Sequence, residues 1–160
     1  MHAGDPDLQT TADALLALDA AGCDVIELGV PYGDPLADGP TIQDAAFRAL
    51  ENGATTEKVV AMLRETVPRL RAPVILFTYF NVVRARGIDQ FCESIRAAGV
   101  AGLLVPDIPV EETAEIRSAV NAHGMELVLL VAPTSGAPWL ACLNNMYDDA
   151  AHCWPHAWQL

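Results

Sequence analysis

The sequence predicts an α/β fold in which parallel strands alternate with helices. Short runs that are apolar on both faces recur along the chain, and segments with helical spacing of apolar residues separate them. Such runs are typical of parallel strands covered on both sides. Gly22, Gly99 and Gly124 stand where a helix ends and the next strand begins. This alternation predicts right-handed crossovers, and it leaves open whether the sheet is doubly wound or closed into a (β/α)8 barrel.

Length and composition indicate a globular domain. The 160 residues are enough for one core, and 52% of them are hydrophobic against 19% charged. The formal net charge of −12 argues against a nucleic-acid or anionic-membrane partner. No run approaches the ~18–20 apolar residues of a membrane span. No signal peptide is visible and the cysteines lack CxxC spacing, so we expect a reduced, intracellular setting.

The predicted elements follow in order along the chain. Neither GxGxxG after a strand nor GxxxxGK[ST] occurs, so no nucleotide-binding fingerprint applies. Helices are predicted over residues 8–18, 59–70, 91–98 and 111–123. Strands are predicted at residues 24–30 (DVIELGV), 73–80 (PVILFTYF), 102–106 (GLLVP) and 126–131 (ELVLLV).

An acidic residue stands inside the first predicted strand. Glu27 shares a face with Val25 and Gly29, whereas Ile26 and Leu28 take the opposite face. In a barrel, Ile26 and Leu28 would pack against helices. Glu27 would point inward near the carboxyl end of the strand, partly desolvated and suited to proton transfer. A structural glutamate paired with an arginine or a backbone amide explains the pattern equally well.

The loop after this strand, VPYGDPLADGP, carries Asp34 and Asp38 among prolines and glycines. Asp-Pro and Asp-Gly are ordinary turn dipeptides, so turn formation by itself accounts for both aspartates. A loop this tightly specified would also hold one or two carboxylates over the mouth of a barrel, where loops carry function. The residues themselves leave both interpretations open.

The stretch IELGVPYGDPLADGPTIQDA, residues 26–45, resembles the signature of the tryptophan synthase alpha-subunit family. AGDPDLQTT resembles the family's first loop, and LFTYFN resembles its third strand. GLLVPDIPVEET and ELVLLVAPTS resemble its fourth and fifth strands, in wording most similar to the cyanobacterial and plastid branch. The resemblance covers Ala3 to about Ser135.

This resemblance implies a TIM (β/α)8 barrel lyase of tryptophan biosynthesis. The family cleaves indole-3-glycerol phosphate to indole and glyceraldehyde 3-phosphate in a retro-aldol reaction that needs no cofactor and no metal. The resemblance implies that Glu27 is the catalytic acid and base. It implies that Asp38 is the carboxylate that stabilises positive charge at the indole N–H.

Other positions also carry family roles by resemblance. Phe77 and Tyr79 match pocket-lining, substrate-binding positions. Asp34, Asn81 and Asp107 match loop positions that face or communicate with the beta subunit, to which the family passes indole. The resemblance implies a location in the cytoplasm, or in the plastid stroma if the chain comes from a photosynthetic eukaryote.

The sequence departs from the family in length. A (β/α)8 barrel typically needs ~250 residues, and strands two to five of the family barrel are the ones that match. We expect residues 3–135 to form a partial TIM barrel, truncated at both ends and beginning inside the first loop. Val82 replaces the family's usual proline, so we expect a less rigid loop there.

The end of the chain breaks the pattern. Residues 136–160 hold all three tryptophans, and no strand or capped helix is legible in them. We expect an aberrant tail from a reading-frame change or a retained intron. Its His152, Cys153 and His156 match no usual zinc spacing, so we expect no metal site.

The missing half has consequences for function. The sixth strand and the phosphate loops do not appear, so we expect substrate affinity and orientation to collapse and this chain to lack catalysis of its own. The alternative functions are an inactive fragment, or a non-catalytic piece that binds a tryptophan synthase beta subunit.

Overall fold

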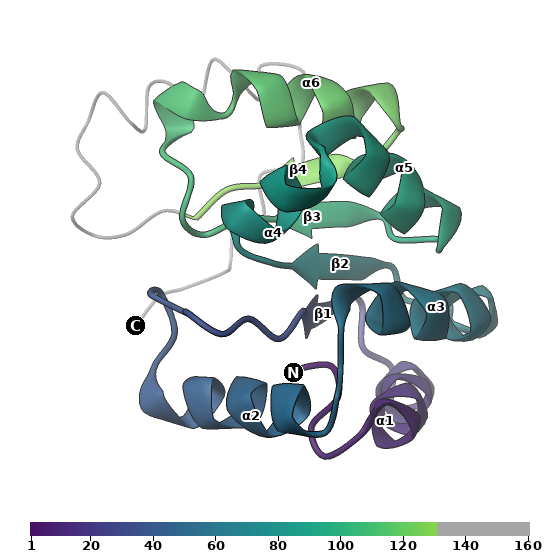
Figure 1. Ribbon diagram of the computed structural model, residues 1–160. Helices are drawn as coiled ribbons and strands as arrows, with labels where there is room; N and C mark the ends of the chain where they lie inside the picture. The colour runs from purple at the N-terminus through teal and green to yellow at the C-terminus, as the bar shows by residue number, and fades with distance from the viewer. Residues whose placement is uncertain (131–160) are drawn as a thin grey trace, which may run out of the picture. The chain divides into compact units, whose positions relative to one another are not determined.

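Four parallel strands form a single sheet in the computed structural model, which describes residues 1–130. The strands lie side by side in sequence order, so each crossover returns the chain to the next position in the sheet (Figure 1). This arrangement confirms the predicted α/β fold with parallel strands. The strands are β1 (Ile26–Gly29), β2 (Val74–Phe77), β3 (Gly102–Leu104) and β4 (Glu126–Val128).

Helices connect the strands. In Figure 1, α1, α2 and α3 lie near β1 and β2, and α6 lies beside β4. The periodicity of the sequence predicted the helices next to the strands but not α2 or α4. The helices are α1 (Leu8–Ala20), α2 (Pro40–Glu51), α3 (Thr56–Thr66), α4 (Phe80–Arg86), α5 (Ile88–Ala97) and α6 (Ala114–Ala122), with short 3-10 turns η1 (Val67–Arg69) and η2 (Val110–Glu112).

Local chemistry fixes where α1 begins and ends. The Asp7 carboxylate accepts a hydrogen bond from the Thr10 amide at 2.7 Å, which satisfies a free N–H of the first turn. After the last turn, Gly22 has a φ of +89° and turns the chain toward β1. Gly99 and Gly124 also have positive φ after α5 and α6, which confirms the predicted helix-ending glycines.

One face of the sheet packs against the helices. Ile26 is 3% exposed and Leu28 is fully buried, whereas Val25 on the opposite face is 37% exposed. The alternation confirms that Ile26 and Leu28 pack against helices, as the sequence predicts. Each such side chain contributes about 1.5–3 kcal/mol through burial. The same buried face continues with Val74, Leu76, Leu103 and Leu127.

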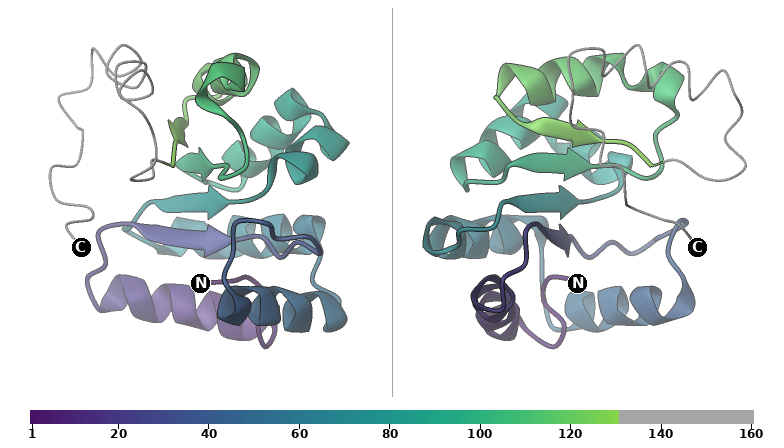
Figure 2. Two further views of the ribbon diagram at one scale, coloured as in Figure 1. Left: turned by 90° about the vertical axis from the view of Figure 1, so that its left-hand side faces the viewer. Right: turned by 180° about the vertical axis from the view of Figure 1, so that it is seen from behind.

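The opposite face of the sheet is open in the part of the chain that the structure describes. Seen from behind, no helix of residues 1–130 lies in front of β2, β3 and β4 (Figure 2, right). Glu27 and Glu126 are exposed on this face. One register row of the face is Glu27, Ile75, Gly102 and Glu126, and the next is Gly29, Phe77, Leu104 and Val128.

Gly102 allows close packing within the first of these rows. A Cβ atom at this position would lie 2.7 Å from Ile75 Cδ1 and 2.8 Å from the Glu126 carbonyl oxygen. Because the glycine lacks that atom, the Ile75 side chain lies over β3 while β3 stays in register with β4.

The first residues extend the sheet beside β1. His2 forms a parallel bridge with Gly29. The Gly29 amide donates to the Met1 carbonyl at 2.8 Å, and the Ala3 amide donates to the Gly29 carbonyl at 2.9 Å. Residues 1–3 therefore lie along the edge of β1 that β2 does not occupy.

All four strands end earlier than the sequence predicts, with β1 ending at Gly29 instead of Val30 and β3 at Leu104 instead of Pro106. β2 ends at Phe77 instead of Phe80, because Tyr79 is the N-cap residue of α4 and Phe80 begins that helix. β4 ends at Val128. Residues 1–130 form one compact unit. The predicted boundary at Ser135, the tail at residues 136–160 and its histidines and cysteine lie outside the described residues.

Two further sequence expectations concern membrane-spanning segments and metal sites. Among residues 1–130, no helix combines the length and the apolar character that a bilayer crossing requires. The same part of the chain contains no group of three or more histidine, cysteine, aspartate or glutamate side chains arranged to hold a metal ion.

Candidate functional site

The candidate site lies at the carboxyl ends of the strands. In a parallel sheet these ends meet at one edge, and the loops that leave them carry the chemistry of barrel enzymes. The loop after β1 carries Asp34 and Asp38, the turn after β2 carries Tyr79 and the loop after β3 carries Asp107.

Glu27 lies on the open face of β1. Its backbone is in register with Ile75 of β2, and its side chain is exposed. The expected partial desolvation of Glu27 is therefore wrong for residues 1–130, because no element of this part covers the face. None of the ion pairs and hydrogen bonds among the described residues involves the Glu27 carboxylate, so the alternative of a structural, arginine-paired glutamate has no support there.

Asp38 is held by a side chain from the next strand end. The Tyr79 hydroxyl donates to Asp38 Oδ2 at 2.9 Å. The same hydroxyl accepts a hydrogen bond from the Ala37 amide at 3.1 Å. The Gln43 side-chain amide donates to the Asp38 carbonyl at 2.8 Å. Asp38 is thus tied at both its side chain and its main chain.

Asp34 has a different environment in the same loop. Its side chain is exposed, and its carbonyl accepts the Leu36 amide at 3.0 Å in a tight turn. The neighbouring Leu36 side chain is 81% exposed. The turn interpretation therefore describes Asp34, whereas the Asp38 carboxylate points to Tyr79.

Tyr79 is the most buried group of the site. It is 1% exposed, its ring stacks on Tyr32 with centroids 5.1 Å apart, and Phe77 meets it edge-on at 5.9 Å. Burial, with the hydrogen bond to the Asp38 carboxylate as a second cause, raises the pKa of the Tyr79 phenol to about 12. The hydroxyl therefore stays protonated and remains a donor at neutral pH.

The other predicted loop residues join this cluster. The Asn81 side-chain amide donates to the Tyr32 hydroxyl at 3.3 Å. The Asp107 carboxylate accepts the Phe80 amide at 2.8 Å, at the start of α4, where a negative charge is favourable. Asn81 and Asp107 have exposed side chains. The loops after β1, β2 and β3 are therefore connected by hydrogen bonds at one edge of the sheet.

Three residues of this region were missed from the sequence. Tyr32 and Gln43 make the contacts above, and both lie in the signature stretch 26–45, where the resemblance assigned them no role. His2 is 8% exposed, and its ring fills the space that a Cβ atom on Gly29 would occupy. Its Nδ1 atom has no hydrogen-bond partner, and burial lowers its pKa from the usual value. His2 lies before the first periodic segment of the sequence, so no hydrophobic pattern could indicate its placement beside Gly29.

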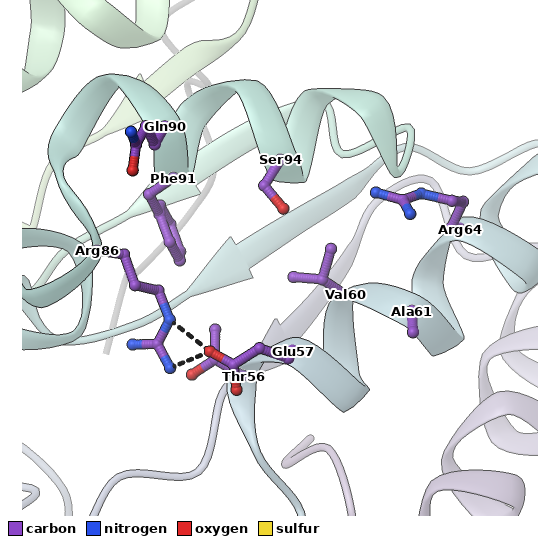
Figure 3. Close-up of a pocket in the computed structure, with 9 residues that line it drawn as sticks. All are labelled: Thr56, Glu57, Val60, Ala61, Arg64, Arg86, Gln90, Phe91 and Ser94. Carbon is purple, nitrogen blue, oxygen red and sulfur yellow. Dashed lines mark hydrogen bonds and ion pairs between the residues drawn. The ribbon is translucent and has the colours of Figure 1, made fainter.

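A separate groove lies in the helical layer, between α3 and the segment from the end of α4 through α5 (Figure 3). Its volume is about 380 Å³. Arg86 Nε and Nη2 donate to Glu57 Oε1 at 2.9 and 2.7 Å across it. None of the predicted site residues lines this groove, whose walls are Thr56, Glu57, Val60, Ala61, Arg64, Arg86, Gln90, Phe91 and Ser94.

Comparison with known sequences gives one family. A sequence profile described as tryptophan synthase alpha chain matches residues 1–147. The tryptophan synthase alpha chain of Trichormus variabilis is 58% identical over 135 residues, which are 84% of this chain and 51% of that protein. That of Picosynechococcus sp. is 59% identical over 133 residues, 83% of this chain and 50% of its own length. The chain spans about half the length of the curated relatives it matches.

Solved structures agree with the sequence relatives. A tryptophan synthase complex from Pyrococcus furiosus contains a chain that matches with a TM-score of 0.87 and 38% identity, covering 91% of this chain and 60% of that one. An aminoacrylate-bound tryptophan synthase from M. tuberculosis matches with a TM-score of 0.83 and 36% identity, covering 88% of this chain and 57% of that one. These neighbours are TIM barrels, so the four-stranded sheet is part of such a barrel.

Proposed function

The chain belongs to the tryptophan synthase alpha chain family, and from this premise we propose that it carries one half of an indole-3-glycerol-phosphate lyase site for tryptophan biosynthesis. The observation that supports this proposal best is the Asp38 carboxylate, which Tyr79 holds at the carboxyl edge of the sheet with a 2.9 Å hydrogen bond. A carboxylate used for turn formation alone would not need a buried partner from the turn after another strand.

The proposed reaction breaks the bond between indole C3 and the glycerol chain. Glu27 donates a proton to indole C3 and takes the proton of the adjacent glycerol hydroxyl, whose carbon becomes the carbonyl of glyceraldehyde 3-phosphate. Asp38 accepts a hydrogen bond from the indole N–H and stabilises the positive charge that develops there. Phe77 and Tyr79 provide aromatic surface for the indole ring. The reaction proceeds without oxidation or reduction, so it requires no redox cofactor.

A beta subunit is the proposed protein partner. The similar structures from Pyrococcus furiosus and M. tuberculosis are of tryptophan synthase, the first described as a complex. The exposed side chains of Asp34 and Asp107 lie in the loops after β1 and β3, and that of Asn81 lies in the first turn of α4, so all three are available to a partner that docks on this edge. The proposed location is the cytoplasm, or the plastid stroma in a photosynthetic eukaryote.

A non-catalytic role is the second candidate function. The chain spans about half of its relatives' length, and Glu27 lies on a sheet face that residues 1–130 leave open. A site that admits water gives weaker electrostatic stabilisation of the transition state. Under this candidate, the chain binds a beta subunit through the same loops but releases no indole.

Indole release by the purified chain tests the catalytic proposal. Any indole that the unaltered chain releases from indole-3-glycerol phosphate should fall by roughly 10²–10⁴-fold in Glu27→Gln, the usual contribution of a general acid–base group. Glu126→Gln is the matched control, because Glu126 is exposed on the same face and in the same register row.

An equal loss in both variants, or no indole from the unaltered chain, would reject catalysis and leave family membership intact. In that case, co-purification with a tryptophan synthase beta subunit decides the non-catalytic candidate. Absence of binding at micromolar concentrations would reject it.

A further inference from the structure

The Tyr79 hydroxyl is fully used inside the protein. It accepts the Ala37 N–H at 3.1 Å and donates its one proton to Asp38 Oδ2 at 2.9 Å. The residue is 1% exposed. A phenol has one proton to donate, so this hydroxyl cannot also donate to a substrate while the bond to Asp38 persists.

The ring that carries this hydroxyl is fixed on two sides. Tyr32 stacks on it at 5.1 Å, and Phe77 meets it edge-on at 5.9 Å. The Tyr32 hydroxyl in turn accepts the Asn81 side-chain amide at 3.3 Å. The position of the Tyr79 oxygen is therefore set by packing against β2 and the loop after β1, and does not depend on a substrate.

The contact between Gln43 and Asp38 restrains the main chain of Asp38 and not its carboxylate. Gln43 donates to the main-chain carbonyl of Asp38 at 2.8 Å and leaves the carboxylate free to rotate. Among the described residues, Oδ2 of the carboxylate accepts from Tyr79, and no hydrogen bond reaches Oδ1. Tyr79 is thus the side chain that selects which carboxylate oxygen remains available.

We propose that Tyr79 is a positioning residue, which holds Asp38 in one orientation through Oδ2 so that Oδ1 is presented to the indole N–H. This inference rests on the proposed function for the identity of the ligand. It assigns Tyr79 a role beyond lining the pocket, because its hydroxyl acts on the catalytic carboxylate and its ring is the part that faces other aromatic groups.

Amide hydrogen exchange tests the positioning contact without any need for turnover. Tyr79→Phe keeps the ring and removes the hydroxyl. We therefore expect the Ala37 amide to exchange roughly three- to tenfold faster, because the loss of one hydrogen bond raises the equilibrium constant for local opening by about this factor. Tyr32→Phe is the matched control, since it removes a hydroxyl from the stacked ring without touching Ala37 or Asp38. Equal exchange at Ala37 in the unaltered chain and in Tyr79→Phe would overturn the proposal.

A phenol titration gives a second measurement on a different variant. The midpoint for Tyr79, followed by the absorbance of tyrosinate, is expected to fall from about 12 in Asp38→Asn but to stay above the usual 10, because burial is the larger cause and remains while the charged acceptor is lost. Asp34→Asn is the control, since Asp34 lies in the same loop with an exposed side chain. A midpoint for Tyr79 that is the same in all three proteins would count against the bond.

Kinetics separate positioning from simple substrate contact. In a chain that releases indole, we expect Tyr79→Phe to lower kcat by roughly 10–100-fold with little change in KM, since misplacing a catalytic group costs rate more than binding. A raised KM with unchanged kcat would mean that Tyr79 only lines the pocket, and would overturn the proposal. If the unaltered chain releases no indole, the proposed function fails, and the exchange and titration results still decide whether Tyr79 positions Asp38.

Discussion

The two carboxylates of the proposed site are held in different ways. Glu27 projects from β1 with an exposed side chain, so its orientation is set by the strand alone. Asp38 lies in a loop, and its orientation depends on the buried Tyr79 hydroxyl. A loop carboxylate needs such a partner because its backbone is less restrained than that of a strand.

Gly102 gives a prediction at the scale of one residue. Gly102→Ala adds a Cβ atom 2.7 Å from Ile75 Cδ1 and 2.8 Å from the Glu126 carbonyl oxygen. The side chain can shift but the β4 backbone cannot without loss of register, so we expect destabilisation of about 1–3 kcal/mol in urea unfolding. Gly33→Ala is the control, because its nearest neighbour is Leu50 Cδ1 at 3.9 Å. Equal midpoints for both variants would contradict this packing.

At the scale of elements, Asp19 joins the end of α1 to the start of β2. Its Oδ1 accepts the amides of Arg71 and Ala72, both at 2.8 Å, and Arg71 Nη2 donates to its carbonyl at 3.0 Å. The hydrogen bond from the Ala72 amide lowers the pKa of the Asp19 carboxyl most. Desolvation opposes it and the Arg71 contacts add to it, so the pKa lies below its usual value of 3.8. One carboxylate thereby satisfies two backbone donors just ahead of a strand.

Removal of this contact is expected to loosen the junction of α1 and β2. Asp19→Ala leaves the amide of Ala72, which is 6% exposed, without its acceptor. We expect a Tm lower by at least roughly 4 °C in thermal unfolding. Asp13→Ala is the control on the same helix, because Asp13 is exposed and contacts only the Gln9 side chain among described groups. An equal Tm for Asp19→Ala and Asp13→Ala would show that the contact between Asp19 and Ala72 does not stabilise the fold.

The same contact predicts a dependence of stability on pH. A carboxyl with a lowered folded-state pKa binds fewer protons when folded than when unfolded. Its contribution is complete above the unfolded value near 3.9 and is lost as the pH falls through the lower folded value. We therefore expect the Tm difference between the unaltered chain and Asp19→Ala to be constant from pH 7 to 5 and to shrink below pH 4. A difference that grows on acidification would contradict this assignment.

At the scale of the whole molecule, the net charge and the sheet face that residues 1–130 leave open have opposite effects on association. The chain has a formal net charge of −12 and a sequence pI of 4.4. The open face combines Glu27 and Glu126 with half-buried Phe77 and Val128. At neutral pH the negative charge keeps copies apart, whereas apolar surface favours association.

Association is therefore expected to depend on pH. Light scattering should report a larger hydrodynamic radius near pH 4.4 than at pH 7, because the net charge approaches zero there. Phe77→Ser should reduce the increase by removing apolar surface from the open face. A radius that stays constant between these pH values would contradict the expected role of this face.

The local hydrophobic pattern of the sequence predicted most of the fold. The helix-ending glycines, the parallel strands and the opposite faces of Ile26 and Glu27 follow from residue type and a period of two or 3.6 residues. The resemblance in the sequence indicated the family that the comparisons then gave. The start of α4 at Phe80 was not predicted, because an apolar run does not reveal where an N-cap interrupts a strand.

The sequence by itself determined the order of the four strands along the chain, the faces they bury and the family. The tertiary structure alone decided that Tyr79 meets Asp38 across 41 residues and that Asp19 meets Ala72 across 53. Such pairs depend on crossovers that bring successive strand ends to one edge of the sheet, and no local period encodes them. It also decided that Glu27 is exposed in residues 1–130, since burial depends on what covers a face and not on the residue that occupies it.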